Sequence, residues 1–387
     1  MSLVFPHTFV PWFRAVAPYI HAYRGKSFVV ALAGEAIAAG KLSAFVQDLA
    51  ILHAMGIKIV LVHGFRPQVT EQLAAKGHVS RFVRGIRVTD AVALDAAQEA
   101  AGQLRFEIEA AFSQGLPNTP MANSTVRVVS GNFLTARPVG IVDGVDFMNS
   151  GLVRRVDQVA IRRAIESGAL VLLSPFGFSP TGEAFNLTME EVATSTAIAL
   201  GADKLVFMTE IPGIHERADD AESAIDTELS LAEAKRLLAA LPSPTQPSDT
   251  AFYLQHCVKA CEGGVERSHI LPFATDGALL LEVFTHDGII FGCAALYAYP
   301  EARTGEMAAL TVSPLSQSQG DGERLLKRIE QRARLAGLES IFVLTTRTMH
   351  WFIKRGFVAV DTEWLPEARK RKYNADRRSQ VLVKKLV

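Results

Sequence analysis

The most telling stretch of this sequence is 311–326, TVSPLSQSQGDGERLL. It predicts the end of a strand, then a Q-x-x-G-x-G loop, then a helix that begins near Glu323. Gly320 and Gly322 carry no Cβ, so their N–H groups can approach a phosphate closely, and the helix start adds unpaired amides and its positive dipole end. We interpret the loop as an anion cradle, although a plain surface loop is the alternative for such a glycine pair.

The segments around the loop have the pattern of a sheet with a docked helix. Apolar runs at 289–297 and 305–312 predict two strands before the loop, and the run at 341–346 predicts another strand after it. A short helix starting near Met349 follows and is capped by Gly356. The expected cradle comprises eight residues: Val312, Gln317, Ser318, Gln319, Gly320, Asp321, Gly322 and Glu323.

This part of the chain also carries the motif W-F-x-x-R-G-F at 351–357. The order strand, strand, glycine loop, helix, strand and then this motif resembles the GNAT acetyltransferases, whose loop holds the pyrophosphate of acetyl-CoA. Finer matches at 305–308, 343–348 and 377–382 are similar to the bacterial N-acetylglutamate synthase family. The resemblance implies acetyl-CoA as cosubstrate, L-glutamate as acceptor and no metal.

Length and composition bound the other possibilities. A chain of 387 residues predicts two domains. A formal net charge of +0 and a pI near 7.2 give no bulk attraction to nucleic acid or to an anionic membrane. Three cysteines at uneven spacing do not suggest a disulfide framework or a zinc site. We read no signal peptide and no membrane span, and we expect a cytoplasmic protein.

The front of the chain alternates strands and helices up to about residue 214. Strands are expected at 28–32, 58–64, 169–173 and 204–208, with one helix running from the first strand to Met55. Because these strands are almost continuously apolar, they predict a parallel sheet covered on both faces. Glycine-containing turns follow the first two strands, at the sheet edge where such folds bind ligands.

Segments at 86–90, 129–133, 185–188 and 201–206 resemble landmarks of the amino-acid kinase fold. Active kinases of this fold carry a lysine in the first strand to neutralise the transferred phosphoryl group, but Ala31 stands at that position here. We therefore expect an α/β protein. Its first domain, 1–285, would be a parallel-sheet sandwich of amino-acid kinase type without kinase activity, and its second, 286–387, a GNAT domain.

The synthase family uses such an inactive domain to bind arginine as a feedback inhibitor. The resemblance places the effector site at Tyr19, Lys204, His269, Glu282 and Gly288. Glu282 has the clearest chemical reason, because a carboxylate can pair with a guanidinium through two parallel hydrogen bonds. The alternative is that Glu282 is an ordinary solvated helix charge.

The passage between the two expected domains is unusually short. The first domain runs almost directly into the strand at 289–297, where the GNAT family normally has a first strand and two helices. Either that segment is missing from the sequence as given, which we favour, or the protein lacks it. In the second case one side of the glutamate pocket would be open and apolar sheet surface would be exposed.

Acetyl transfer to an amine needs a base that removes a proton from the ammonium group. Glu306 lies in an otherwise apolar strand, where desolvation should raise its pKa and so suit it as a base acting directly or through water. The alternative is a strand-end carboxylate whose hydrogen-bond partners are satisfied. By resemblance, Ser379 is the acid toward the leaving thiolate and a substrate contact, and Arg377 is a clamp for the substrate carboxylate. Arg347 is counted with them as a polar anchor, and the basic run 369–372 is expected to be mostly solvated.

Together these patterns predict an amino-acid N-acetyltransferase that makes N-acetylglutamate and is regulated by L-arginine. A homo-oligomer is expected, and the resemblance implies a hexamer, with no nucleic-acid or membrane partner. Two other functions stay open. One is a non-catalytic arginine-binding regulatory protein, which a truly shortened junction would favour. The other is an active acetylglutamate kinase, which Ala31 disfavours.

Overall fold

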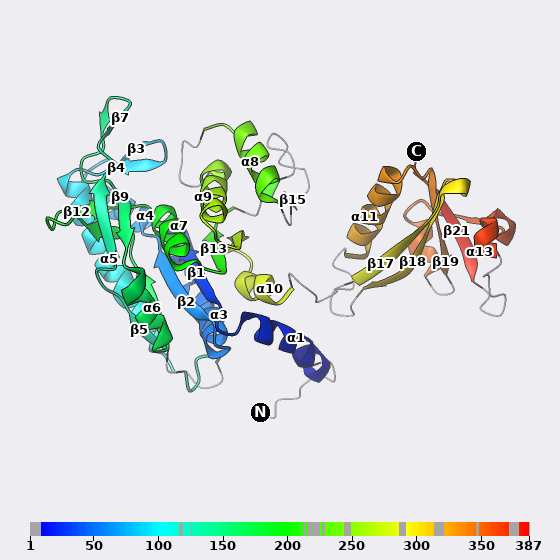
Figure 1. Cartoon of the computed structure of the whole chain (residues 1–387), viewed down its shortest axis with the longest axis horizontal. Coiled ribbons are helices and arrows are strands. Elements are labelled where there is room, and N and C mark those ends of the chain that lie inside the picture. Colours follow the sequence, from blue (N-terminus) through cyan, green and yellow to red (C-terminus); the bar gives the residue numbers. More distant parts are fainter. Residues whose placement is uncertain are drawn as a thin grey trace. The chain divides into compact units, whose positions relative to one another are not determined.

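The computed structural model describes residues 9–115, 119–124, 126–211, 214–215, 225–226, 229–243, 249–285, 292–312, 321–345, 348–370 and 379–386. The chain divides into two compact units, Met1–His286 and Asp287–Val387 (Figure 1). This division lies one residue from the boundary expected between 285 and 286.

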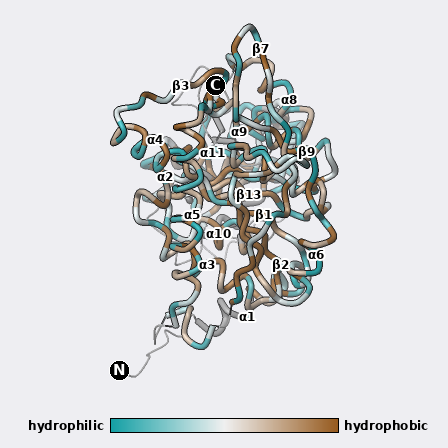
Figure 2. Tube along the Cα trace, turned by 90° about the vertical axis from the view of Figure 1, so that its left-hand side faces the viewer, coloured by the Kyte–Doolittle hydropathy of each residue, from teal (hydrophilic) through white to brown (hydrophobic). Residues whose placement is uncertain are grey.

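A six-stranded parallel sheet forms the centre of the first unit (Figure 1). In sheet order its strands are β16 (Arg267–Pro272), β13 (Lys204–Thr209), β1 (Ser27–Leu32), β2 (Lys58–His63), β10 (Ala169–Leu173) and β5 (Arg127–Val129). Almost every residue of the four inner strands is buried. Burial on both faces explains why these strands are apolar without alternation, and Figure 2 shows hydrophobic colour along β1 and β2. The predicted α/β fold with a parallel sheet is confirmed.

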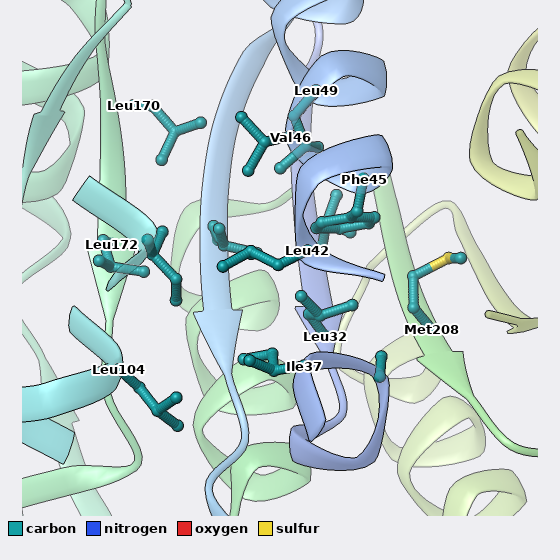
Figure 3. Close-up of a cluster of buried hydrophobic side chains, with 14 of the residues drawn as sticks. Leu32, Ile37, Leu42, Phe45, Val46, Leu49, Leu104, Leu170, Leu172 and Met208 are labelled. Carbon is teal, nitrogen blue, oxygen red and sulfur yellow. The ribbon is translucent and has the colours of Figure 1, made fainter. Parts of the chain in front are cut away.

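Helices cover both faces of this sheet. One face packs against α3 (Leu42–Ala54), α5 (Ala91–Phe112) and α10 (Ala278–Thr285). The other face packs against α6 (Gln158–Glu166), α7 (Met189–Leu200) and α9 (Thr250–Glu262). Successive residues of β1 point to opposite faces, so Leu32 joins the first cluster and Ala31 the second. Figure 3 shows Leu42, Phe45 and Leu49 of α3 in the first cluster.

The expected single helix after β1 is wrong, because two helices occupy this stretch. They are α2 (Gly34–Ala38) and α3, separated by Gly40. Gly40 has a φ of +72°, a left-handed conformation that ends a helix and that residues with a Cβ adopt at a cost. The break turns the chain, so that α3 packs on the sheet while α2 stays at the end of β1.

The remaining elements of the first unit surround this sandwich. A second, four-stranded sheet has the order β12 (Ala184–Asn186), β11 (Phe176–Phe178), β6 (Leu134–Pro138) and β9 (Gly151–Val156). Three strand pairs are β3 (Arg81–Val83) with β4 (Ile86–Val88), β7 (Ile141–Val142) with β8 (Val145–Asp146), and β14 (Ile214–His215) with β15 (Ile225–Asp226). The other helices are α1 (Phe9–Tyr23), α4 (Arg66–Ala75) and α8 (Leu231–Ala240).

The second unit is a five-stranded sheet covered by helices. Its order is β17 (Gly292–Tyr299), β18 (Thr304–Val312), β19 (Ser340–Thr345), β21 (Gln380–Lys385) and β20 (Val358–Val360). The helices α11 (Asp321–Leu335) and α12 (Met349–Ile353) pack on one face. The opposite face carries Phe342, Leu365 and Val381, and Leu365 leads into the short helix α13 (Glu367–Lys370).

The core of the first unit provides a test of these assignments. Leu49 on α3 is 0% exposed, so Leu49→Ala should lower the free energy of unfolding of this unit by about 2–5 kcal/mol, because burial is lost and a cavity is left. Urea unfolding followed by circular dichroism measures the change. The control Val159→Ala, at a side chain 54% exposed on α6, should stay within about 0.5 kcal/mol. Equal losses in both variants would contradict the packing described.

Candidate functional site

Glu306 lies inside the sheet of the second unit and is 6% exposed. On β18 it pairs with Tyr297 of β17 and with Phe342 of β19. The parallel ladder between β18 and β19 ends at the Glu306–Phe342 pair, although both strands continue. Beyond Glu306, the backbone N–H and C=O groups that β18 and β19 direct toward each other are not hydrogen-bonded between the two strands. These groups need other partners.

Strand β18 also carries a bulge just after Glu306. Cys293 of β17 pairs with Thr311, and Ala295 pairs with Ala308, so β18 has one residue more than β17 between these two pairs. A bulge increases the local twist and re-aims the backbone, and bulges are frequent next to active sites. The bulge and the end of the ladder together mark this part of β18 as a place where a ligand can meet the backbone.

The carboxylate of Glu306 is held by two side chains. Arg369 of α13 donates from Nε to Oε2 at 2.5 Å and from Nη2 to Oε1 at 2.9 Å, and the hydroxyl of Tyr299 donates to Oε2 at 3.3 Å. The hydrogen bond to Glu306 raises the pKa of Arg369. Burial and then the charge of Glu306 raise the pKa of Tyr299. The arrangement is a two-bond ion pair.

The expectation that the basic run 369–372 is solvated is wrong for Arg369. Its side chain is only 19% exposed because it reaches Glu306. Lys370 does face the surface, where it pairs with Glu367, and residues 371–372 lie outside the described part of the chain. Arg369 and Tyr299 are the site residues that sequence reasoning missed. No spacing rule could identify Arg369, since it is 63 residues from Glu306.

The expected cofactor cradle is only partly within the described residues. Val312 ends β18, while Asp321, Gly322 and Glu323 form the first turn of α11. The helix begins two residues earlier than predicted, which places Gly322 in the helix rather than in the loop. Gln317, Ser318, Gln319 and Gly320 lie outside the described residues.

An arginine from the W-F-x-x-R-G-F motif reaches the start of α11. The guanidinium of Arg355 lies 4.0 Å from the ring centroid of Trp351, and its Nη2 donates to Glu323 at 3.3 Å. The Glu323 side chain is thereby held by cations, which also include Lys327 at 3.9 Å. Its backbone amide, at the helix start, remains suited to an anion.

Ser379 is half-buried and directly precedes β21. Val383 of β21 lies opposite Phe342, which in turn pairs with Glu306. Since side chains alternate along a strand, Ser379 shares the sheet face of Val381 and Val383. It stands four residues from the level of Glu306, or ~13 Å along the strand. Arg347 and Arg377 lie outside the described residues.

Three of the expected effector residues meet in the first unit. Glu282 of α10 lies 3.0 Å from Nδ1 of His269 and 3.4 Å from Nζ of Lys204, and both distances are to Oε1. Nζ of Lys204 also lies 3.3 Å from Nε2 of His269. The side chains of Lys204, Glu282 and His269 are 3%, 12% and 10% exposed. The alternative of a solvated Glu282 therefore does not hold.

The N-terminal helix lies beside this cluster. Tyr23 of α1 places its ring 5.2 Å from Nζ of Lys204, and Tyr19 packs edge-on against Phe284 of α10. The hydroxyl of Tyr19 is buried without a hydrogen-bond partner, which a ligand could supply. Gly288 lies outside the described residues.

A cleft opens at the carboxyl ends of β1 and β2, where a kinase of this fold would work. Its free space is about 590 Å³, including the part open to solvent. Ala31 is fully buried in β1 and offers no cation to it. Gly34 and Gly64 touch so closely that a Cβ on Gly64 would come within 2.7 Å of the Gly34 nitrogen. The two turns therefore approach each other closely, with no room for a Cβ on Gly64.

Among the described residues, no helix is long and apolar enough to cross a membrane. Within the same part of the chain, no three His, Cys, Asp or Glu side chains gather closely enough to hold a metal ion.

Two family models match the chain. The amino acid kinase family matches residues 26–272, and the acetyltransferase (GNAT) family matches residues 252–357. Residues 252–272 fall in both matches. The structure assigns them to the first unit, because α9 packs on its sheet and β16 pairs with β13. A GNAT match that begins there reaches back across the short junction.

Characterised relatives match nearly the whole chain. The amino-acid acetyltransferase of Ralstonia nicotianae is 52% identical and covers 98% of this chain and 95% of the relative. The enzyme of the same name from Escherichia coli K12 is 40% identical, over 97% of each chain. The Ralstonia alignment runs over 437 residues, more than the 387 of this chain. The relative therefore has residues for which this chain has no counterpart.

Solved structures of N-acetylglutamate synthase are also similar to nearly the whole chain. N-acetylglutamate synthase from Neisseria gonorrhoeae, complexed with coenzyme A and N-acetyl-glutamate, is 35% identical over 98% of this chain and 99% of that one, with a TM-score of 0.65. The same enzyme complexed with coenzyme A and L-arginine gives 0.66. Carbamate kinase from Giardia lamblia, at 16% identity and a TM-score of 0.50 over 66% of this chain, shares the fold of the first unit alone.

The cleft of the first unit contains a carboxyl group that should make stability depend on pH. Burial raises the pKa of Glu190 from 4.5 to about 7, opposed by the charge of Arg66. Because the folded state binds the proton more tightly than the unfolded state, stability is lost as pH rises from about 4.5 through about 7. Glu190→Gln, which resembles the neutral acid, should therefore gain up to about 3 kcal/mol relative to wild type between pH 5 and pH 8.

Urea unfolding of both proteins at the two pH values measures this gain. Glu166→Gln is the matched control, since it changes an exposed glutamate at the end of α6. Its effect should be the same at both pH values. An equally constant effect of Glu190→Gln would contradict the assignment of a buried, proton-binding carboxyl group.

Proposed function

This chain belongs to the amino-acid acetyltransferase family, and we propose on that basis that it is an N-acetylglutamate synthase regulated by arginine. It would transfer the acetyl group of acetyl-CoA to the amino group of L-glutamate, the first step of arginine biosynthesis. The observation that carries the proposal is the position of Glu306. Glu306 lies at the last pair of the ladder between β18 and β19. It is on β18, the strand that precedes the expected cradle and the start of α11.

The reaction requires that the amino group lose a proton before it attacks. Acetyl-CoA supplies an acetyl group activated as a thioester. The nitrogen lone pair forms the new C–N bond, the C–S bond breaks, and the thiolate takes up a proton. Without a base, the ammonium group of glutamate has no lone pair to offer. We assign the base to Glu306, acting directly or through water.

Arg369 is hydrogen-bonded to the carboxylate that we assign as the base. Its two hydrogen bonds hold both carboxylate oxygens of Glu306. L-glutamate brings two carboxylates of its own, and each fits a guanidinium fork in the same two-bond geometry. We propose that a substrate carboxylate competes for Arg369 and so releases Glu306 as the substrate arrives.

The other functional residues divide between cofactor and leaving group. The cradle from Val312 to Glu323 would hold the pyrophosphate through backbone amides at the start of α11. Ser379 would donate a proton to the leaving thiolate, and Arg347 and Arg377 would bind the substrate. The N–H groups of β18 beyond Glu306, freed by the end of the ladder, can bind the cofactor or polarise the acetyl carbonyl.

The first unit would sense arginine. Glu282 is already held by two nitrogen donors, His269 and Lys204, so the cluster accepts cationic or N–H donor groups. A guanidinium offers five donors in a planar fork and should be preferred to the point charge of a lysine side chain. The site lies on α10, which ends at Thr285 next to the junction with the second unit. A ligand that binds one arrangement of the chain better than another shifts that equilibrium.

We further propose that residues 1–285 form the sensing domain and residues 286–387 the acetyltransferase domain. A cytoplasmic location and a homo-oligomer, specifically a hexamer, follow from the resemblance to the synthase family. A kinase function has little physical support, because Ala31 provides no cation. A purely regulatory protein is disfavoured by the similarity of nearly the whole chain to amino-acid acetyltransferases.

The role of Glu306 predicts a large loss of activity. Glu306→Gln should lower kcat by roughly 10²- to 10⁴-fold, as is typical when a general base is removed, and should leave acetyl-CoA binding nearly unchanged. Steady-state kinetics across pH measures both parameters. Glu301→Gln, at an exposed glutamate of the same unit, should retain wild-type turnover. If Glu306→Gln keeps the acidic limb of the pH profile, another group is the base.

The role of Glu282 predicts a loss of regulation without a loss of catalysis. Glu282→Ala should abolish the effect of arginine on acetyl transfer and leave turnover without arginine nearly intact, because the residue belongs to the effector cluster rather than to the acetyl-transfer site. Calorimetry with arginine and a rate assay test both parts. Glu262→Ala, which removes an exposed carboxylate of α9, should keep the response. Wild-type arginine affinity in Glu282→Ala would place the sensor elsewhere.

A further inference from the structure

Neither acetyl transfer nor the effector cluster uses the cleft at the carboxyl ends of β1 and β2. Its walls come from the turns after these strands, from the β3–β4 hairpin, and from the segment that joins β12 to α7. Apolar parts of Phe82, Ile86 and Leu187 line it between charged groups. A cleft lined by apolar surface with a few convergent polar groups is the usual form of a small-molecule site.

One edge of the cleft is cationic. Arg66 donates from Nε and Nη2 to Oε1 of Glu35, which uses one side of the guanidinium and leaves Nη1. Arg87 is 6% exposed and donates from Nη2 to the Arg66 carbonyl at 3.1 Å, while Phe82 stacks on its guanidinium at 4.6 Å. The helix α4 also begins here, and its cap residue Phe65 offers no side-chain acceptor to the first amides, although Pro67 in this turn has no N–H. This edge can receive a carboxylate.

Another edge of the cleft carries hydrogen-bond acceptors. Asn186 is 8% exposed and donates from Nδ2 to Thr89 at 3.0 Å, but its Oδ1 is buried without a partner. A buried acceptor without a donor is costly and calls for a ligand or water. Glu190, at the start of α7, is 5% exposed and hydrogen-bonds with Tyr253. This edge can receive an ammonium group.

From these two sets of lining groups we propose that the cleft binds a free α-amino acid, with its ammonium group toward Asn186 and Glu190 and its carboxylate toward Arg66 and the start of α4. A phosphorylated ligand is disfavoured, because Glu35 adds a negative charge beside Arg66 in the lining of the cleft. The site is distinct from the cluster of Lys204, His269 and Glu282.

Ammonium binding should depend on the charge of Glu190. The groups that act on this carboxyl are Arg66, Glu35 and Tyr253. An ammonium group prefers the ionised carboxylate, so affinity should increase as pH rises through about 7, where Glu190 loses its proton. A ligand whose nitrogen is acylated carries no positive charge and should show no such rise.

Calorimetry of the full-length protein with L-glutamate and L-arginine between pH 6 and pH 8 tests the proposal. In wild type, at least one of the two amino acids should bind at a site other than the acetyl-transfer site and the effector cluster. Its affinity for this additional site should increase with pH. Glu190→Gln should weaken binding at this site at least tenfold and remove its pH dependence. Asn186→Asp, which keeps the acceptor and adds a negative charge, should strengthen it. Glu166→Gln, far from the cleft on α6, should behave as wild type.

The opposite directions of the two cleft variants separate a ligand effect from a loss of folding. N-acetyl-L-glutamate is the matched probe without an ammonium group, and the same variants should not alter its binding. The proposal is overturned if neither amino acid shows binding at this site that responds to both variants. It is also overturned if N-acetyl-L-glutamate shows the response and the free amino acids do not.

Discussion

A parallel sheet that must be buried on both faces is the constraint on which the first unit depends. Because β1, β2, β10 and β13 expose almost nothing, helices have to cover each side. The helix α10 belongs to one of these layers and α9 to the other. The same requirement therefore brings Glu282 of α10 beside Lys204 of β13. It also places the turns after β1 and β2 at one edge, where the cleft forms.

Glu306 and Glu282 are both buried carboxylates with cationic partners, but the number and length of their contacts differ. Glu306 and Arg369 form a complete two-bond pair inside the second unit, which stabilises a charge that would otherwise be costly to bury. In the first unit, Glu282 meets Lys204 and His269 through single, longer contacts. Two-bond pairing fixes the orientation of Glu306, and a substrate carboxylate can compete for Arg369 only by offering the same two-bond geometry. Single, longer contacts can be exchanged for a ligand that offers a better-shaped donor.

The contrast between Glu306 and Arg369 shows how far sequence reasoning reaches. Glu306 stood out as a carboxylate in an apolar strand, a local signal that needs no tertiary information. Arg369 lay in a basic run that normally faces solvent, and its pairing depends on Leu365 docking α13 on the sheet. Likewise, Asn186 and Glu190 look ordinary in sequence. Only the folded chain shows that one has a buried oxygen without a partner and the other a raised pKa.

The sequence by itself determined the parallel α/β sandwich, the acetyltransferase sheet and the absence of a kinase lysine at Ala31, since these depend on local apolar pattern and residue identity. It also indicated Glu306 and the effector residues. The tertiary structure alone decided where the helix after β1 breaks, which cation holds Glu306, and that a cleft lies at the carboxyl ends of β1 and β2. These features depend on contacts between residues far apart in the chain, and no periodicity or spacing within a segment encodes them.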